Sequence, residues 1–302
     1  MTTIAIRGTQ WLIDGAVAYA GAPAEGLLMN VRMVNATFED LARDDWDPEA
    51  NTDAFIAHLP DYVAHGVRAF TLNLQGGTPG YEGAVNSAYR PDGTLHAEYL
   101  ARVRRAIEAC DAAGAAVILG LYYQRQSGIL EDEDAVRAGV VHASEWVAEE
   151  GFGNVALEIA NEFGHPGFRH GILKDPDGQA ELIGLAKQTA PGMLVSTSGL
   201  GHGRLPAAVA EAADFLLIHY NETPLVEIPD RIAALRGYDK PIVCNEDVKE
   251  GEEGARAAET SVREGASWGL MLERVNQHFP FSFRGHLDDP IVYERLRALT
   301  TA

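Results

Sequence analysis

Two glutamates, each directly preceded by an asparagine, follow short apolar runs in the second half of the chain. Asn161 and Glu162 end the run LEIANE, and Asn245 and Glu246 end the run IVCNE. Two carboxyl groups on opposite sides of a ligand can act as a general acid and as a nucleophile or base. Either pair alone is weak evidence, because Asn and Glu are common in loops and at helix caps. Together the two pairs make Glu162 and Glu246 the candidate catalytic residues.

The elements that must position these glutamates follow from an alternation along the chain. Short apolar runs, often β-branched, alternate with longer segments of helical period, which predicts βα units around a parallel sheet. Eight such runs favour a closed barrel over an open sheet of about five or six strands. The runs span 27–33, 67–74, 115–123, 154–160, 192–198, 214–220, 241–246 and 267–272. We therefore expect residues 1–302 to form one α/β domain, a single (β/α)8 TIM barrel.

Three segments outside the predicted strands carry further expectations. Residues 1–25 contain an Asp14-Gly15 turn between two extended runs, which predicts an N-terminal β-hairpin that plugs the barrel floor. Asn51 and Thr52 are expected to cap a helix over 52–64. The longest irregular segment, QGGTPGYEGAVNSAYRPDG at 75–93, follows the second run. A loop of this length in a compact domain is expected to be functional.

Polar residues end almost every apolar run, at the edge of the barrel where such folds place their sites. Buried strands have little reason to end in this way unless the polar groups converge on a polar ligand. Runs four and seven lie across a closed barrel from each other, so Glu162 and Glu246 would flank that ligand. We expect the other strand-end residues to bind substrate: Asn30, Arg32, Asn73, Gln75, Tyr123, Asn161, His219, Tyr220 and Glu273.

These motifs resemble those of retaining glycoside hydrolases of the large (β/α)8 clan that includes β-mannanases, β-galactosidases and many cellulases. Members carry Asn-Glu at the end of strand four and Glu at the end of strand seven. The resemblance implies that Glu162 is the acid/base, Glu246 the nucleophile and Asn161 a ligand of the sugar 2-hydroxyl. It also implies that His219 or Tyr220 keeps Glu246 ionised. A more enclosed Glu162 would have its pKa raised and stay protonated.

The chain also departs from the clan's pattern. Thr71 occupies the strand-two position where many members have an arginine that binds the nucleophile, and Arg32 on the neighbouring strand is the expected replacement. Trp268 comes too early in SWGLML to be the sugar platform that often ends strand eight. Asp247 follows Glu246 where an aromatic residue is common. These departures indicate a divergent subfamily.

Composition limits the partners of the protein. Its 44 acidic and 24 basic residues give a formal net charge of −20, which disfavours nucleic acid and anionic membranes. Cys110 and Cys244 are expected to be reduced, buried thiols. No apolar stretch is long enough to span a membrane and the N-terminus has no signal-peptide pattern, so we expect a cytoplasmic protein. The expected partner is a carbohydrate, with no metal or cofactor; the sequence predicts no oligomeric state.

Two other functions remain open from the sequence. A metal-dependent sugar isomerase or hydrolase would use Glu162, His219, Glu246 and Glu273 as ligands. One histidine at a strand end, without an HxH or HExxH pair, argues against it. A barrel that binds sugar without catalysis is favoured by the missing strand-two arginine. Of the aromatic residues near the loops, at most one or two are expected to stack on sugar rings: Trp46, Tyr81, Tyr122, Tyr123 and Phe163.

Overall fold

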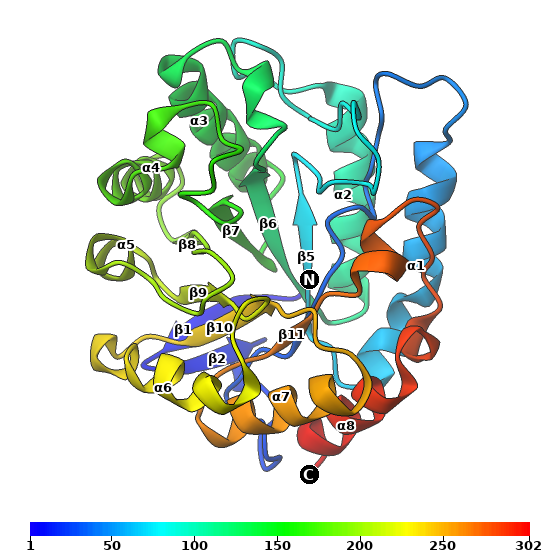
Figure 1. Cartoon of the computed structure of the whole chain (residues 1–302), viewed down its shortest axis with the longest axis vertical. Helices are drawn as coiled ribbons and strands as arrows, with labels where there is room; N and C mark the ends of the chain where they lie inside the picture. The colour runs from blue at the N-terminus through cyan, green and yellow to red at the C-terminus, as the bar shows by residue number, and fades with distance from the viewer.

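The computed structural model describes residues 1–302 and contains each of the eight predicted barrel strands (Figure 1). Most of their residues are apolar and all but one are buried, as expected of parallel strands covered on both faces. The strands are β4 (Asn30–Arg32), β5 (Ala69–Asn73), β6 (Ala116–Tyr122), β7 (Val155–Ala160), β8 (Leu194–Ser196), β9 (Leu216–His219), β10 (Ile242–Glu246) and β11 (Gly269–Leu270).

The eight strands close into a ring. Six of them pair side by side in the order β11, β4, β5, β6, β7, β8, and β9 pairs with β10. A parallel bridge between Ser198 and Leu217 joins β8 to β9. Bridges from Val243 to Ser267 and from Asp247 to Leu270 join β10 to β11. The fold is therefore the predicted (β/α)8 barrel.

One helix follows each barrel strand, and the helices form an outer ring around the strands (Figure 1). They are α1 (Pro48–Ala64), α2 (Ala97–Ala112), α3 (Glu133–Glu149), α4 (Pro176–Thr189), α5 (Ala207–Ala212), α6 (Ile228–Ala233), α7 (Gly251–Arg263) and α8 (Pro290–Thr300). Short helical turns lie in the loops at Ser127–Ile129, Gly171–Leu173, Leu225–Glu227, Arg236–Tyr238, Glu273–Gln277 and Gly285–Asp288. No helix is both long and apolar enough to cross a membrane.

The start of α1 differs from the prediction. The cap is Asp47, whose side chain accepts hydrogen bonds from the backbone N–H groups of Glu49 and Ala50. Pro48 then occupies the first helical turn, where its missing N–H costs nothing. Asn51 and Thr52 were predicted to cap this helix, but their side chains donate to loop carbonyls, including that of Ala36. The helix therefore begins about one turn earlier than expected.

The N-terminal segment forms a small antiparallel sheet of β1 (Ile4–Arg7), β2 (Gln10–Ile13) and β3 (Ala16–Val17). The indole of Trp11 on β2 is fully buried and packs edge-on against Phe215, with ring centroids 5.1 Å apart. Trp11 belongs to one apolar cluster with Ala116 and Leu217 from the barrel strands. The hairpin therefore closes the barrel floor, and the site must lie at the other end, where the polar strand ends gather.

Candidate active site

Arg32, at the end of β4, lies in the centre of the polar end of the barrel. Its side chain is fully buried, and its Nε lies 2.7 Å from Oε2 of Glu246. A second guanidinium nitrogen lies 3.7 Å from Oε2 of Glu158, and a third donates to the amide oxygen of Asn161. One arginine thus contacts residues of both Asn-Glu motifs and fixes their relative position.

Glu246 is held by contacts on both of its carboxylate oxygens. Oε2 faces Arg32, and Oε1 accepts a hydrogen bond from the amide of Asn221. Its side chain retains only 5% of its exposure. These contacts fix the orientation of the carboxylate. The part of the side chain that remains exposed lines the pocket described below.

Glu162 stands one residue beyond β7 in a left-handed backbone conformation, with φ of 52°. Its backbone N–H donates to the hydroxyl of Ser198, 2.9 Å away, and its Oε2 accepts from the amide of Gln124 at 3.2 Å. Gln124 in turn accepts from the amide of Asn161. Left-handed residues other than glycine are uncommon and often mark functional sites. The conformation turns the Glu162 carboxylate toward the middle of the barrel mouth.

His219, at the end of β9, lies between the two glutamates. Its Nδ1 is 3.4 Å from Oε1 of Glu162 and 3.6 Å from Oε2 of Glu246. One ring nitrogen and one oxygen from each carboxylate all lie within 4.8 Å of one another. The two candidate carboxylates therefore face each other across a gap of a few ångströms, as the strand count predicted.

These contacts shift the pKa values of His219 and Glu162 in opposite directions. Burial alone would lower the pKa of His219, but Glu246 and Glu162 outweigh it, and the pKa is raised. Burial alone would raise the pKa of Glu162, but the hydrogen bond and charge of His219 and the charge of Arg32 outweigh it, and the pKa is lowered. The sequence-based expectation of a raised pKa for Glu162 is therefore wrong. Glu162 is also the less enclosed of the pair, at 15% exposure.

Glu158 was missed by the sequence analysis. It lies within β7, is fully buried, and shares Arg32 with Glu246. Its Oε2 also accepts a hydrogen bond from the amide of Asn245 at 3.3 Å. The available signal was an ionisable residue inside the apolar run NVALEIA, because a charge on a buried strand requires a partner. Asn245 thus holds Glu158 in place and does not line the pocket.

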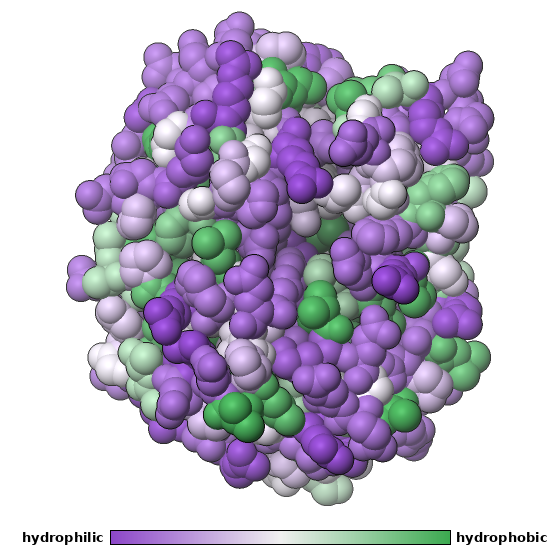
Figure 2. Space-filling view, viewed as in Figure 1, coloured by the Kyte–Doolittle hydropathy of each residue, from purple (hydrophilic) through white to green (hydrophobic).

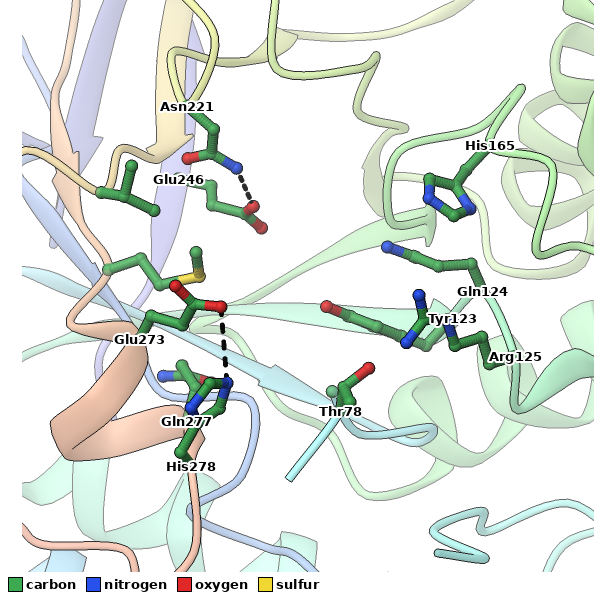
Figure 3. A pocket seen from close by; sticks show the side chains of 13 residues that line it. Thr78, Tyr123, Gln124, Arg125, His165, Asn221, Glu246, Glu273, Gln277 and His278 are labelled. Carbon is green, nitrogen blue, oxygen red and sulfur yellow. Dashed lines mark hydrogen bonds and ion pairs between the residues drawn. The ribbon is translucent and has the colours of Figure 1, made fainter. Parts of the chain in front are cut away.

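A pocket of about 440 Å³, here called the barrel-top pocket, opens above these residues (Figure 3). Glu246 and Asn221 lie on one side, and Tyr123, Gln124 and Arg125 project from the opposite side. Figure 2 shows a hollow near the middle of this face, surrounded mainly by hydrophilic residues. The complete lining is Gly77, Thr78, Tyr123, Gln124, Arg125, His165, Asn221, Glu246, Val248, Met271, Glu273, Gln277 and His278.

Of the nine residues predicted to bind substrate, only Tyr123 and Glu273 line this pocket. Arg32, Asn161, His219 and the candidate acid Glu162 are not part of its lining, but they contact Glu246 or Gln124, which are.

Asn30, Asn73 and Gln75 also lie outside the lining of the pocket. The amide of Asn30 donates to the carbonyls of Leu28 and Cys244, deeper in the barrel. Asn73 is fully buried over Gly120, where a Cβ would lie only 2.4 Å from its amide oxygen. Gln75 donates to the Ser87 hydroxyl and anchors the long loop. Asn30, Asn73 and Gln75 therefore have structural contacts instead.

Tyr220 also lies away from the two glutamates, contrary to the prediction. Burial raises the pKa of its phenol, which packs near Cys244 and Asp247 and does not line the pocket. His219 ends β9, and Tyr220 and Asn221 follow it. His219 and Asn221 contact Glu246, whereas the Tyr220 phenol lies beside Ser261 of α7. The alternation of side-chain direction along His219, Tyr220 and Asn221 was the signal in the sequence that could have identified Asn221 in place of Tyr220.

Trp268 and Asp247, two residues that depart from the clan's pattern, are hydrogen-bonded to each other. Trp268 is fully buried and its Nε1 donates to Oδ2 of Asp247 at 2.8 Å. Lys249 donates to Oδ1 of Asp247 at 2.9 Å. Burial nevertheless raises the pKa of Asp247 above its ordinary value. Instead of forming a sugar platform, the tryptophan ties β11 to the end of β10, directly beside Glu246.

Two other predicted residues do line the pocket. Tyr123 is half-buried on the wall opposite Glu246. Burial and the charge of Glu246 raise the pKa of its phenol, so it stays neutral. Glu273 lies at the exposed rim, where one oxygen is 3.4 Å from Nε2 of His278. Tyr123 is thus the one aromatic ring of the original candidates that faces the barrel-top pocket.

Glu162, His219 and Glu246 are close enough to be considered as metal ligands. The donor set argues against that role. Arg32 and Asn221 already occupy the two oxygens of Glu246, and the cationic Arg32 beside them would repel a second cation. A second group, Asp61, His65 and His286, is equally close. There the imidazoles stack 4.2 Å apart; Nδ1 of His286 hydrogen-bonds to the Asp61 carboxylate, and Nδ1 of His65 hydrogen-bonds to the backbone carbonyl of Asp61.

Comparisons with known proteins identify the fold. No protein-family model matches the chain, and no curated protein matches its sequence. Among solved structures, a broad-specificity endoglucanase from Clostridium longisporum has a TM-score of 0.65 at 10% identity, over 94% of this chain and 98% of its own. The β-mannanase of the blue mussel Mytilus edulis has a TM-score of 0.64 at 13% identity, over 98% and 96%.

A larger protein of Bacteroides vulgatus ATCC 8482, described as a candidate glycoside hydrolase, has a TM-score of 0.69 at 12% identity. The alignment covers 98% of this chain but 60% of that one. Likeness at such low identity is informative about architecture. The chain therefore shares the (β/α)8 barrel found in these glycoside hydrolases and mannanases.

Proposed function

We propose that this protein is a retaining glycoside hydrolase in which Glu162 is the acid/base and Glu246 the nucleophile. The observation that carries the proposal is the approach of the two carboxylates, whose nearest oxygens lie within 4.8 Å. Carboxyl groups about 5–5.5 Å apart are typical of retaining enzymes, and about 6.5–9.5 Å is typical of inverting enzymes. The shared fold with solved glycoside hydrolases supports the same reading.

In the proposed reaction an oxygen of Glu246 attacks the anomeric carbon of the sugar. The glycosidic C–O bond breaks, and Glu162 donates a proton to the departing oxygen, which leaves as an alcohol. Glu162, now ionised, takes a proton from water as the water attacks the glycosyl–Glu246 ester. The ester bond breaks, the sugar leaves with its original anomeric configuration, and Glu162 is protonated again.

Arg32 and Asn221 prepare Glu246 for this attack. Asn221 donates a hydrogen bond to its carboxylate, and the guanidinium of Arg32 forms an ion pair with it. Arg32 also donates a hydrogen bond to the side-chain oxygen of Asn161. This bond fixes the amide of Asn161 so that its nitrogen donates to Gln124. Substrate-positioning groups that are fixed before binding reduce the reorganisation needed in the transition state.

The proton that Glu162 needs is supplied by the Glu162–His219 pair. With the pKa of Glu162 lowered and that of His219 raised, a proton shared by the pair resides on His219 rather than on Glu162 before substrate binds. Its Nδ1 lies 3.4 Å from the Glu162 carboxylate. A substrate that fills the pocket removes water from Glu162, which favours its neutral form. Proton transfer from His219 to Glu162 then creates the acid in the bound complex.

The proposal is tested by turnover of aryl glycosides of glucose, mannose and galactose. With the fold retained, Glu246→Gln is expected to lower kcat/KM at least about a thousandfold, and Glu162→Gln at least about tenfold, because an aryl leaving group needs less protonation. Glu252→Gln, an exposed carboxylate on α7 with no ion pair, is the matched control. Sugar binding with no turnover in the parent would favour a non-catalytic barrel. Turnover abolished by a chelator and restored by a divalent metal would favour the metal-dependent alternative.

A further inference from the structure

The long loop after β5 borders a second, open cavity beside the barrel-top pocket. Its segment 78–85 forms one wall, and the cavity, here called the loop cavity, has a volume of about 800 Å³. Thr78, Arg125 and His278 line both spaces. The two spaces therefore adjoin at these three residues, so a molecule bound beside Glu246 in the barrel-top pocket would reach the loop cavity past them.

The lining of the loop cavity is chemically different from that of the barrel-top pocket. Most residues around Glu246 are polar or charged. In the loop cavity the charged side chains of Glu82 and Arg125 are exposed at its edge. Its apolar surface comes from Pro79, Tyr81, Ala84, Val85 and Ile129. Such a surface gains free energy by covering apolar groups of a ligand.

The wall of the loop cavity is held in place before any ligand binds. The Tyr81 hydroxyl and the Val85 N–H donate to the two oxygens of Asp40, at 2.8 Å and 3.0 Å. Gln126 donates to the carbonyl of Ala84 at 3.0 Å. These bonds tie the loop to the segments after β4 and β6. Binding there requires little ordering of the chain, which favours affinity.

The loop cavity opens on the acid side of the site. Arg125, which borders it, follows Gln124, and Gln124 donates to Glu162. Glu246 and Asn221 lie across the pocket from Gln124 and Arg125 (Figure 3). In a double displacement the leaving group departs opposite the nucleophile and toward the acid. The loop cavity therefore lies where a leaving group would be.

The aromatic content of the two spaces argues against a long sugar chain as the occupant. Tyr123 and Tyr81 are the only Trp, Tyr or Phe residues in either lining. Trp268 is fully buried under the rim, and Trp46 packs among Phe279 and its neighbours. Broad aromatic faces that could stack on successive sugar rings are thus missing from both linings.

We propose that the loop cavity binds an apolar aglycone, an alkyl or aryl group joined through oxygen to the sugar that is held at Glu162 and Glu246. This inference rests on the proposed function. It makes the 75–93 insertion the determinant of aglycone specificity and assigns the protein to small glycosides rather than polysaccharides.

The test compares methyl, butyl and octyl β-glycosides of the sugar that the protein cleaves, because their leaving groups have similar basicity but different apolar area. In the parent, kcat/KM is expected to be at least about tenfold higher for butyl than for methyl, since each buried methylene contributes about fourfold. Ile129→Asn and Val85→Thr should bring this ratio close to one. Val226→Thr, an exposed valine outside both cavities, should keep the parent ratio.

An unchanged ratio in Ile129→Asn, or a disaccharide cleaved faster than the butyl glycoside, would overturn the inference. If the parent cleaves no glycoside, the proposed function fails, and direct binding still tests the cavity. The probe is free 4-methylumbelliferone, followed by its fluorescence. Binding to the parent that weakens at least about fivefold in Ile129→Asn supports an apolar site, and equal binding by both proteins contradicts it.

Discussion

Arg32 Nε lies 2.7 Å from Glu246 Oε2, so an arginine on the first barrel strand binds the carboxylate that ends the seventh. Thr71, on the second strand, is paired in register with Arg32 across the ladder. The long side chain of Arg32 reaches the barrel centre from the neighbouring strand. A small side chain such as that of Thr71 is therefore sufficient at the paired position. Arg32 therefore places a cation beside Glu246 from the first strand of the barrel.

Replacement of Arg32 should damage both stability and activity. Arg32→Gln removes the charge that compensates Glu158 and Glu246, and breaking a buried ion pair costs about 3–5 kcal/mol. We expect the unfolding free energy in urea to fall by about 3 kcal/mol and kcat to fall at least about a hundredfold. Arg7→Gln, at an exposed arginine without an ion pair, should change neither quantity. An Arg32→Gln protein with parental kcat would exclude Arg32 from the positioning of Glu246.

Glu158 should act through Arg32 rather than through substrate. Glu158→Gln keeps the shape and an oxygen for Asn245 but removes one of the two anions on Arg32. We expect kcat to fall about tenfold with KM nearly unchanged, because Arg32 shifts relative to Glu246 while the pocket lining stays intact. Steady-state kinetics separates the two constants. A rise in KM at constant kcat would show instead that Glu158 affects binding.

The pH profile should report the proton shared by Glu162 and His219. The pKa of His219 is raised, so the proton is retained as pH rises until the pH passes that raised value. The alkaline limb of kcat/KM is therefore expected above the ordinary histidine pKa of about 6.5. In His219→Asn only Glu162 holds the proton, so the limb should move to lower pH. An unmoved alkaline limb would place the essential proton on another group.

Trp268 should contribute to stability more than to binding. Trp268→Phe removes the donor to Oδ2 of buried Asp247, and an unsatisfied buried acceptor costs about 1–3 kcal/mol. Urea unfolding should show a loss of that size. Trp46→Phe is the matched control, because the Trp46 indole donates to a carbonyl while half-buried and its loss should cost less. Equal losses in both variants would contradict the assigned role of Trp268.

The architecture could be predicted from the sequence because buried parallel strands have a strong local signature. Each of the eight apolar runs, such as 115–123 around β6, became a barrel strand. Glu162 and Glu246 face each other because strands four and seven of a closed ring lie on opposite sides. Boundaries were less predictable, since Asp47 and not Asn51 caps α1.

The details of the site depend on side-chain direction and on contacts distant in sequence. Tyr220 and Asn221 are neighbours, yet only Asn221 points to Glu246. The pKa of Glu162 is lowered because His219, from another strand, lies beside it. Neither relationship is local, so neither could be derived from the residues around Glu162 or Glu246 alone.

The most direct measurement is the labelling of the protein by an activated 2-deoxy-2-fluoro glycoside of the cleaved sugar. The fluorine slows breakdown of a glycosyl–enzyme ester, so a retaining enzyme accumulates it. The account predicts a mass increase of one fluoroglycosyl group per chain, mapped by peptide mass spectrometry to Glu246 and absent from Glu246→Gln. A label on a different residue, or turnover that yields the inverted anomer with no label, would contradict the assignment of Glu246 as nucleophile.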